Sequence, residues 1–245
     1  MFNKIAQYYD MIMEPFDYND LVDYLDDLII NAGGERTNIL DLGCGTSEEL
    51  IYFRQLGYEV AGLDNSEEMI NISKYKHPGV DFFQADMTNF KLKRKFDNVI
   101  SCFDTINYIT DKNKLSRCFA ATNKVMNADG IFIFDFNTVF GLINEWEGVR
   151  IEETDQFFIS YDSKFNYDTL ILECKMKFFI KEEEGKYASF NETHYERGYT
   201  SDEIKELLKL NGFKLVKLLP FLKKKAVKDT KLDRYQAVAV KIKEI

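Results

Sequence analysis

Short apolar segments alternate with amphipathic ones through the first half of the chain. Residues 38–42 are mostly apolar and are followed by Gly43 and Gly45, which is typical of a buried strand ending in a tight loop. A helix is predicted next, with Ser47 as a plausible N-cap and Gly57 as its end. The pattern then predicts strands over 59–63, 80–84, 96–102 and 131–134, and helices over 66–75 and 111–126. Such alternation indicates a doubly wound α/β core around a parallel sheet.

The pattern changes between residues 139 and 197. Leu172, Cys174, Met176 and Phe178 alternate with charged residues, which is the period of a half-exposed antiparallel strand. Similar stretches at 156–161 and 187–195 complete a predicted antiparallel β insertion over 139–197, on the substrate side of the molecule. A capping box at 200–203 then begins a helix that ends at Gly212, and two final strands are predicted over 213–219 and 235–242.

These elements divide the chain into three parts. We expect residues 38–138 and 198–245 to form the α/β core, and residues 1–37 to form an N-terminal helical cap before it. Residues 139–197 form the insertion, which we expect to enclose the substrate together with the cap.

Composition and charge narrow the possible partners. The 245 residues include 41 acidic and 32 basic side chains, so the net charge is −9 and the overall field disfavours nucleic acid. The first ten residues lack the apolar core of a signal peptide, and no stretch approaches about 18 uninterrupted apolar residues. We therefore expect a cytoplasmic protein without membrane association, either a monomer or a homodimer. The four scattered cysteines are interpreted as reduced thiols.

The sharpest motif is Leu40-Asp-Leu-Gly-Cys-Gly-Thr46, where the first strand of the parallel sheet ends. Open α/β sheets bind ligands at this edge. Asp64 ends the second strand and Asp86 follows the third, so both acids meet the same edge. A carboxylate about 20 residues after a glycine loop can accept hydrogen bonds from both hydroxyls of a ribose. These residues predict a site for a dinucleotide or for an adenosyl ligand.

The acidic residues beside the glycine loop, residues 43–46, distinguish between these two ligands. A dinucleotide fingerprint places a third small residue where this chain has Glu48, with Glu49 beside it, and two glutamates would repel a pyrophosphate. S-adenosylmethionine carries an ammonium and a sulfonium near this loop, so acids at Asp41, Glu48 and Glu49 favour it.

Several of these motifs together resemble a known family. Asp41-Leu-Gly-Cys-Gly-Thr46, Asp64, Gln84-Ala-Asp-Met87 and the strand over 96–102 resemble successive motifs of class I S-adenosylmethionine-dependent methyltransferases, across residues 38–136. Residues 8–13 with Tyr18 are similar to the N-terminal cap of small bacterial methyltransferases, including sugar-amine N-methyltransferases. The resemblance implies a Rossmann-like, mostly parallel seven-stranded sheet whose last strand is antiparallel. It also implies S-adenosyl-L-methionine as methyl donor and S-adenosyl-L-homocysteine as product.

The resemblance assigns roles along the sheet edge. It implies Asp41, Gly43 and Gly45 at the methionine end, Asp64 at the ribose, and Asp86 with the Met87 backbone at the adenine. Asn65 and Met69 would flank the adenosyl pocket, and Tyr9 would cover the methionine side. The predicted cofactor site also includes Cys44 in the glycine loop and Cys102 and Phe103 after the fourth strand.

Two features that some methyltransferases have are missing from this sequence, and their absence limits the substrate class and the reaction type. The fourth strand is followed by Ser101-Cys-Phe-Asp104 and not by the Asn/Asp-Pro-Pro-Tyr/Phe motif that grips a planar nitrogen of a base or amide. His77 and His194 are the two histidines, and no His and acid cluster has metal-ligand spacing, so a metal-dependent reaction is disfavoured.

Methyl transfer from a sulfonium is an in-line displacement that mainly requires alignment and desolvation of the acceptor. A general base is needed when the acceptor arrives protonated, and His194 and Asp104 are the candidates. Trp146, Tyr195 and Arg197 are candidates for substrate contacts. The simpler alternatives are that His194 lies on the surface of a strand and that Arg197 forms an ordinary salt bridge.

We therefore predict a metal-independent methyltransferase acting on a small molecule, with oxygen, nitrogen and carbon acceptors all open. The alternatives are an NAD(P)-binding Rossmann oxidoreductase, a protein that keeps the fold only to bind a partner, and an RNA methyltransferase. The RNA hypothesis depends on a basic patch, for which a solvated loop balancing the acidic N-terminal helix is the favoured interpretation. The patch comprises Lys223, Lys224, Lys225, Lys228, Lys231 and Arg234.

Overall fold

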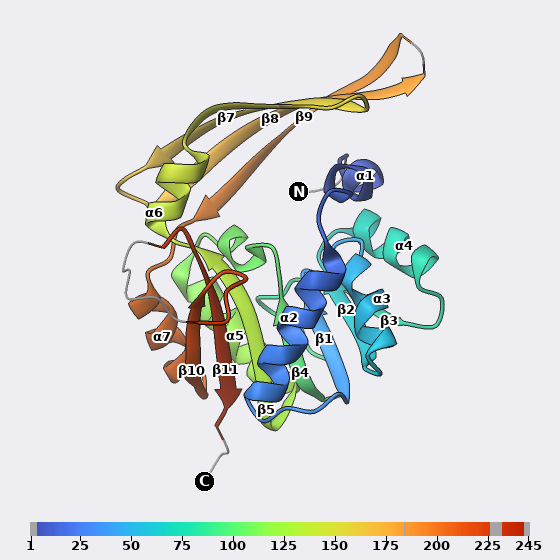
Figure 1. Cartoon of the computed structure of the whole chain (residues 1–245). Coiled ribbons are helices and arrows are strands. Elements are labelled where there is room, and N and C mark those ends of the chain that lie inside the picture. Colours follow the sequence, from blue (N-terminus) through green and yellow to red (C-terminus); the bar gives the residue numbers. More distant parts are fainter. Residues whose placement is uncertain (1–3, 184, 226–231, 243–245) are drawn as a thin grey trace.

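A seven-stranded sheet forms the centre of the molecule in the computed structural model, which describes residues 4–183, 185–225 and 232–242 (Figure 1). The strand order is β10-β11-β5-β4-β1-β2-β3, and β11 is antiparallel to both of its neighbours. The other pairs are parallel, which confirms the predicted mostly parallel doubly wound sheet. The strands are β1 (Asn38–Leu42), β2 (Glu59–Asp64), β3 (Asp81–Gln84), β4 (Phe96–Ser101), β5 (Met126–Asn137), β10 (Phe213–Pro220) and β11 (Arg234–Lys241).

Helices cover both faces of this sheet because its strands are apolar on both sides. In β1, Ile39 packs in the cluster formed with α2 (Tyr18–Asn31) and α3 (Glu48–Gln55), where α4 (Glu67–Lys76) also contributes. The next residue, Leu40, packs on the opposite face with α5 (Lys112–Val125) and α7 (Ser201–Leu210). This alternation is the three-layer arrangement expected for such strands.

A separate four-stranded antiparallel sheet arches over the carboxyl ends of the parallel strands (Figure 1). It contains β6 (Gly148–Glu153), β7 (Phe157–Asn166), β8 (Ile171–Glu183) and β9 (Lys186–Arg197). The short helical turns α6 (Val139–Gly141) and η3 (Leu142–Trp146) connect it to β5. Gly141 is required there because a Cβ atom would lie 2.1 Å from the carbonyl oxygen of Asp233.

An N-terminal segment, defined here as residues 4–13, lies between the two sheets (Figure 1). It contains η1 (Ala6–Tyr8) and α1 (Tyr9–Met13). On the insertion side, the Tyr8 hydroxyl donates to Glu182 Oε1 at 3.0 Å. On the core side, the Asp10 carboxylate accepts from the Thr46 hydroxyl at 2.5 Å and pairs with Lys76 of α4 at 2.7 Å. The segment therefore joins the insertion to the glycine loop.

Three local details differ from the predicted elements or add to them. Ser47 is the N-cap residue of α3 but has φ 63° and makes no capping bond; its hydroxyl lies 2.9 Å from that of Ser73. Strand β5 begins at Met126, directly after α5, and not at residue 131. Strand β6 was not among the predicted elements, although Val149 and Ile151 alternate with Arg150 and Glu152; all six of its residues are exposed. Within the described ranges, no helix is both long and apolar enough to span a membrane.

Candidate active site

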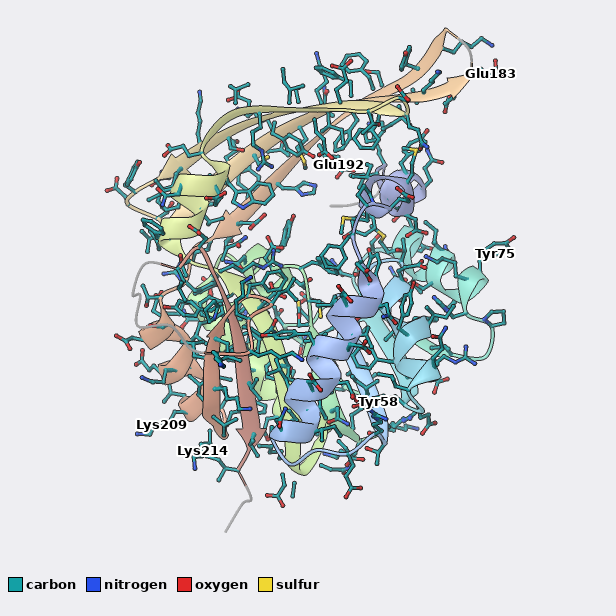
Figure 2. All side chains as sticks on the ribbon, in the orientation of Figure 1. Tyr58, Tyr75, Glu183, Glu192, Lys209 and Lys214 are labelled. Carbon is teal, nitrogen blue, oxygen red and sulfur yellow. The ribbon has the colours of Figure 1, made fainter. Side chains whose placement is uncertain are left out.

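A cavity of about 880 Å³ lies between the carboxyl ends of the parallel strands, the insertion and the N-terminal segment. This volume is in the range of small-molecule and cofactor sites. Figure 2 shows side chains of the four-stranded sheet extending toward the core across this region. The cavity has one half built by the glycine loop and its neighbours, and another half built mainly by the insertion.

The glycine loop is held in place by Asp64 at the end of β2. Gly43 and Gly45 have φ angles of 77° and 51°, which glycine adopts without strain. The Asp64 carboxylate accepts from the Gly45 N–H at 3.0 Å and from the Ser66 N–H at 2.8 Å. Burial raises the pKa of Asp64, although these backbone donors oppose the increase. Each of its oxygens keeps a lone pair that can accept from a ligand hydroxyl.

Asp41 is the most unusual group beside this loop. Its side chain is 1% exposed, and neither of its oxygens accepts a hydrogen bond from any residue that the structure describes. Burial raises the pKa of Asp41 well above its usual value, and the nearby Glu49 carboxyl adds to the increase. Burial also raises the pKa of Glu49. This pair is costly when both carboxyls are ionised unless a cation binds there, so this corner fits an ammonium or sulfonium ligand.

Every residue predicted to bind the cofactor lines this cavity. Tyr9 comes from the N-terminal segment, and burial raises the pKa of its hydroxyl. Met69 comes from α4, and the others come from the ends of β1, β2, β3 and β4 or from the loops that follow these strands. The set is Tyr9, Asp41, Gly43, Cys44, Gly45, Asp64, Asn65, Met69, Asp86, Met87, Cys102 and Phe103.

His194 lies on the cavity side of β9 and is 4% exposed, so the alternative of a surface strand residue is wrong. Its Nε2 lies 2.8 Å from Glu192 Oε2, and its Nδ1 lies 3.1 Å from the Tyr108 hydroxyl. Tyr108 belongs to η2 (Thr105–Tyr108), a short turn after β4, and also lines the cavity. These contacts fix the imidazole from two sides.

Asp104 lies in a carboxyl cluster with Glu196 at the wall of the cavity. The Asn137 amide donates to its carboxylate at 2.7 Å, and Arg234 lies 3.2 Å from it. Glu196 of β9 also lines this wall, and burial followed by the charge of Asp104 raises its pKa well above the usual value. Among the described residues, no group of three His, Cys, Asp or Glu side chains has metal-binding geometry.

The predicted basic patch is divided by the structure. Arg234 lines the cavity and pairs with Asp135 at 2.5 Å, so its assignment to a surface patch is wrong. Lys224 pairs with Asp27 of α2, which agrees with the interpretation of a loop balancing the acidic N-terminal helix. Lys228 and Lys231 lie outside the described residues.

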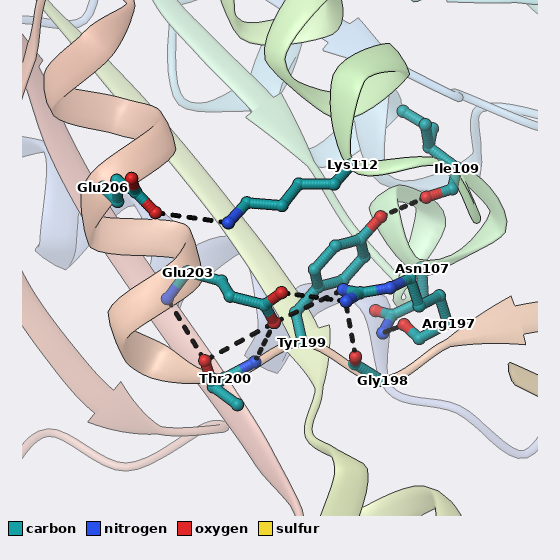
Figure 3. Close-up of polar contacts among 9 residues, drawn as sticks. All are labelled: Asn107, Ile109, Lys112, Arg197, Gly198, Tyr199, Thr200, Glu203 and Glu206. Atoms are coloured by element: carbon teal, nitrogen blue, oxygen red, sulfur yellow. Dashed lines mark hydrogen bonds and ion pairs between the residues drawn. The ribbon is translucent and has the colours of Figure 1, made fainter. Parts of the chain in front are cut away.

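The three predicted substrate residues have different positions. Trp146 lines the cavity. Tyr195 is 43% exposed, is absent from the cavity lining, and donates to Glu173 Oε1 at 2.9 Å. Arg197 is also outside the lining; it pairs with Glu203 at 2.8 Å and lies over the Tyr199 ring (Figure 3). Tyr195 and Arg197 therefore do not line the cavity, contrary to the predicted substrate contacts. Side chains alternate along β9, and it is residues 194 and 196 that point into the cavity.

The prediction also missed Glu196, Tyr108 and Arg234 as cavity residues. Glu196 could have been found from the two-residue period, once His194 was placed on the inner face. Tyr108 and Arg234 carry no such signal. Tyr108 reaches the cavity through the short turn after β4, and Arg234 reaches it through the antiparallel pairing of the last strand.

Comparisons with known proteins give a consistent result. Residues 39–130 match the family described as a methyltransferase domain. The chain is 31% identical over 221 residues to "Putative methyltransferase YqeM" of Bacillus subtilis (strain 168), covering 88% of this chain and 87% of that protein. It is 29% identical over 109 residues, 44% of this chain and 46% of the relative, to the dTDP-3-amino-3,4,6-trideoxy-alpha-D-glucopyranose N,N-dimethyltransferase of Streptomyces venezuelae. An S-adenosylmethionine-dependent methyltransferase from Clostridium acetobutylicum ATCC 824 has a similar fold, with a TM-score of 0.88, 24% identity and 99% coverage of both chains.

Proposed function

The chain belongs to the class I S-adenosylmethionine-dependent methyltransferases, and from this premise we propose that it methylates the nitrogen of a small amine without a metal ion. The charge of the cavity supports this proposal. Two of the described lining residues are basic, Lys114 and Arg234, and eight are acidic. The acidic residues are Asp41, Glu49, Asp64, Glu67, Glu68, Asp86, Asp104 and Glu196. Such a cavity attracts a cationic donor and a cationic acceptor, and repels anionic acceptors such as RNA.

In this proposal, the donor occupies the half of the cavity around the glycine loop. Asp41 and Glu49 face its ammonium, Asp64 accepts from the ribose hydroxyls, and Asp86 with Met87 holds the adenine. The carboxylate of the methionine end lies near the N-terminal end of α3, where the helix dipole favours an anion. When bound, S-adenosylmethionine supplies a methyl group activated by the positive sulfur.

The choice of an amine rests on the carboxyl pair of Asp104 and Glu196, which lines the same cavity as His194. An amine arrives mainly as an ammonium, which carboxylates bind well and which must lose a proton before it can attack. His194 can accept that proton, and Trp146 adds an aromatic wall that suits a cation. The relative from Streptomyces venezuelae, whose name describes an N,N-dimethyltransferase of a dTDP-linked amino sugar, supports the choice of an amino nitrogen; its anionic dTDP group is not part of the acceptor class proposed here.

A labelling experiment tests this function directly. The purified protein would be incubated with a metabolite extract and S-adenosylmethionine labelled on the methyl carbon, and labelled products would be identified by mass spectrometry. We expect an N-methylated small molecule. Products methylated only on oxygen or carbon would overturn the choice of an amine.

Binding measurements separate the other candidate functions. We expect S-adenosylhomocysteine to bind in isothermal titration and NAD(P) not to bind. The opposite result would support an oxidoreductase, and failure to bind either would support a partner-binding protein. Salt-sensitive RNA retention that disappears when Lys223, Lys224 and Lys225 become alanine would support an RNA methyltransferase.

Replacing Asp64 tests the ribose assignment. We expect Asp64→Asn to weaken S-adenosylhomocysteine binding by about 1–3 kcal/mol, because it removes an acceptor for ligand hydroxyls and for the Gly45 N–H. Isothermal titration measures this change. Glu67→Gln, which neutralises an exposed acid at the cavity rim, is the matched control. Equal affinities for both variants and the wild type would contradict the assignment.

Cofactor binding is also expected to release protons. Burial raises the pKa of both Asp41 and Glu49, so the empty pair retains a proton at a pH where isolated carboxyls are ionised. A bound cation favours the ionised form, so affinity rises with pH through the range above the ordinary carboxyl value of 3.8. Titration of S-adenosylhomocysteine in buffers with different ionisation enthalpies measures the release. Proton uptake on binding, or no proton exchange, would contradict binding of the ligand ammonium beside Asp41 and Glu49.

A further inference from the structure

Glu192 of β9 contacts two different parts of the molecule with its two oxygens. Oε1 accepts from the backbone N–H groups of Lys4 and Ile5 at 3.1 and 3.2 Å. Oε2 lies 2.8 Å from Nε2 of His194. The Glu192 side chain is 9% exposed and lies on the side of the four-stranded sheet that faces the N-terminal segment (Figure 2). One carboxylate therefore connects the docked N-terminal segment to the candidate base.

The direction of each hydrogen bond follows from the chemistry of the groups. Burial raises the pKa of Glu192, but the bonds from His194 and from the Ile5 and Lys4 N–H groups outweigh it, and the pKa lies below its usual value. An ionised carboxylate only accepts, so Nε2 of His194 carries a hydrogen. In the neutral imidazole, Nδ1 is then an acceptor, and the Tyr108 hydroxyl at 3.1 Å donates to it.

We propose that Glu192 is a positioning residue that fixes the Nε2–H tautomer of His194 when the N-terminal segment is docked, and that the Tyr108 hydroxyl passes the acceptor's proton to His194 Nδ1. This inference rests on the proposed function. Glu192 is fully held only in the docked state, because Lys4 and Ile5 supply its other two donors. Ile5, Tyr9 and Met13 of the same segment also line the cavity. In this proposal, docking of the N-terminal segment therefore closes the cavity and fixes the His194 tautomer at the same time.

The proton transfer balances within the chain. The ammonium acceptor gives a proton to the Tyr108 oxygen, while the original Tyr108 proton moves to Nδ1 of His194. Tyr108 ends as a neutral phenol and His194 as an imidazolium, whose charge the Glu192 carboxylate offsets. The freed lone pair of the acceptor nitrogen then forms the bond to the transferred methyl group, and the electron pair of the broken carbon–sulfur bond stays on sulfur.

The tautomer can be measured without knowing the acceptor. The chain has two histidines, so long-range ¹H–¹⁵N correlation spectra of the ¹⁵N-labelled protein contain two imidazole patterns, and His194→Gln assigns them. At pH 8.5, above the ordinary titration range of imidazole, we expect the Nε2–H pattern for His194 in the wild type. We expect Glu192→Gln to lose this preference and give a mixture. An Nδ1–H pattern in the wild type, or an unchanged pattern in Glu192→Gln, would overturn the proposal.

A second pair of variants tests the connection to the N-terminal segment and serves if Glu192→Gln does not fold. Ile5→Pro removes one N–H donor to Glu192 at a residue whose φ of −74° suits proline, and Ile5→Ala removes similar volume but keeps the N–H. We expect the His194 ¹⁵N shifts to move toward the mixture in Ile5→Pro only. Identical spectra for the two variants would overturn the connection. Failure of the labelling experiment with the Nε2–H pattern intact would instead overturn the proposed function.

Discussion

Replacing Asp41 with asparagine is expected to weaken S-adenosylmethionine binding by about 1.5–3 kcal/mol, a decrease of roughly 10- to 150-fold. Asp41 is buried, and its oxygens accept no hydrogen bond from a described residue, so we expect the donor ammonium to stabilise its ionised form. The same change is expected to raise the free energy of unfolding of the ligand-free protein by about 1 kcal/mol at neutral pH, because it removes a carboxyl group that ionises freely in the unfolded chain but is hindered from ionising by burial in the folded protein.

The stability effect has a defined pH dependence. Burial raises the folded-state pKa of Asp41 above the ordinary value of 3.8, so the native state binds more protons than the unfolded state between these two values. The destabilisation is absent below the ordinary value and grows as pH rises through the folded-state value. Asp41→Asn should therefore gain little stability in acid.

Isothermal titration and chemical denaturation measure the two effects. Asp23→Asn makes the same chemical change on the exposed side of α2 and should leave both quantities unchanged. An Asp41→Asn protein that binds the cofactor as tightly as the wild type would remove the strongest argument for the location of the donor ammonium.

His194→Gln is expected to lower kcat by roughly 100- to 10,000-fold, the usual contribution of a general base. Glutamine keeps a polar side chain between Glu192 and Tyr108 but cannot accept the acceptor's proton. Cofactor affinity should stay near the wild-type value, because His194 lies in the half of the cavity built by the insertion.

The rate of labelled methyl incorporation measures this effect, with S-adenosylhomocysteine affinity as the test of an intact cofactor site. Tyr195→Phe alters the neighbouring residue on the outer face of the same strand and should retain full activity. Equal rates for His194→Gln and the wild type would show that the acceptor reaches the cavity already deprotonated.

The α/β core and the cofactor half of the cavity could be predicted because their signals are local. The strand over 38–42 carries its apolar run, its glycines and its acid in one stretch, and Asp64 and Asp86 follow strands with the same pattern. Parallel pairing then brings these strand ends to one edge without further information.

The acceptor half was harder to predict because it depends on long-range pairing. Arg234 reaches the cavity through the antiparallel pairing of β11 with β5, and no local pattern marks that position as buried. Residues 194–197 of β9 all carry polar or aromatic groups, so composition alone did not separate the inner His194 and Glu196 from the outer Tyr195 and Arg197. Strand β6 carries only a short alternation, of Val149 and Ile151 with Arg150 and Glu152, and both apolar side chains are exposed.

The position of the N-terminal segment has a consequence for how the protein is made. Lys4 and Ile5 precede their partner Glu192 by 188 and 187 residues in the sequence, and Tyr8 precedes its partner Glu182 by 174 residues. Contacts between such distant residues require the largest loop closures, which form late in folding. During translation, the glycine loop can therefore form before the insertion that covers the cavity has been synthesised. We expect the cavity to be complete only after residues 139–197 have left the ribosome.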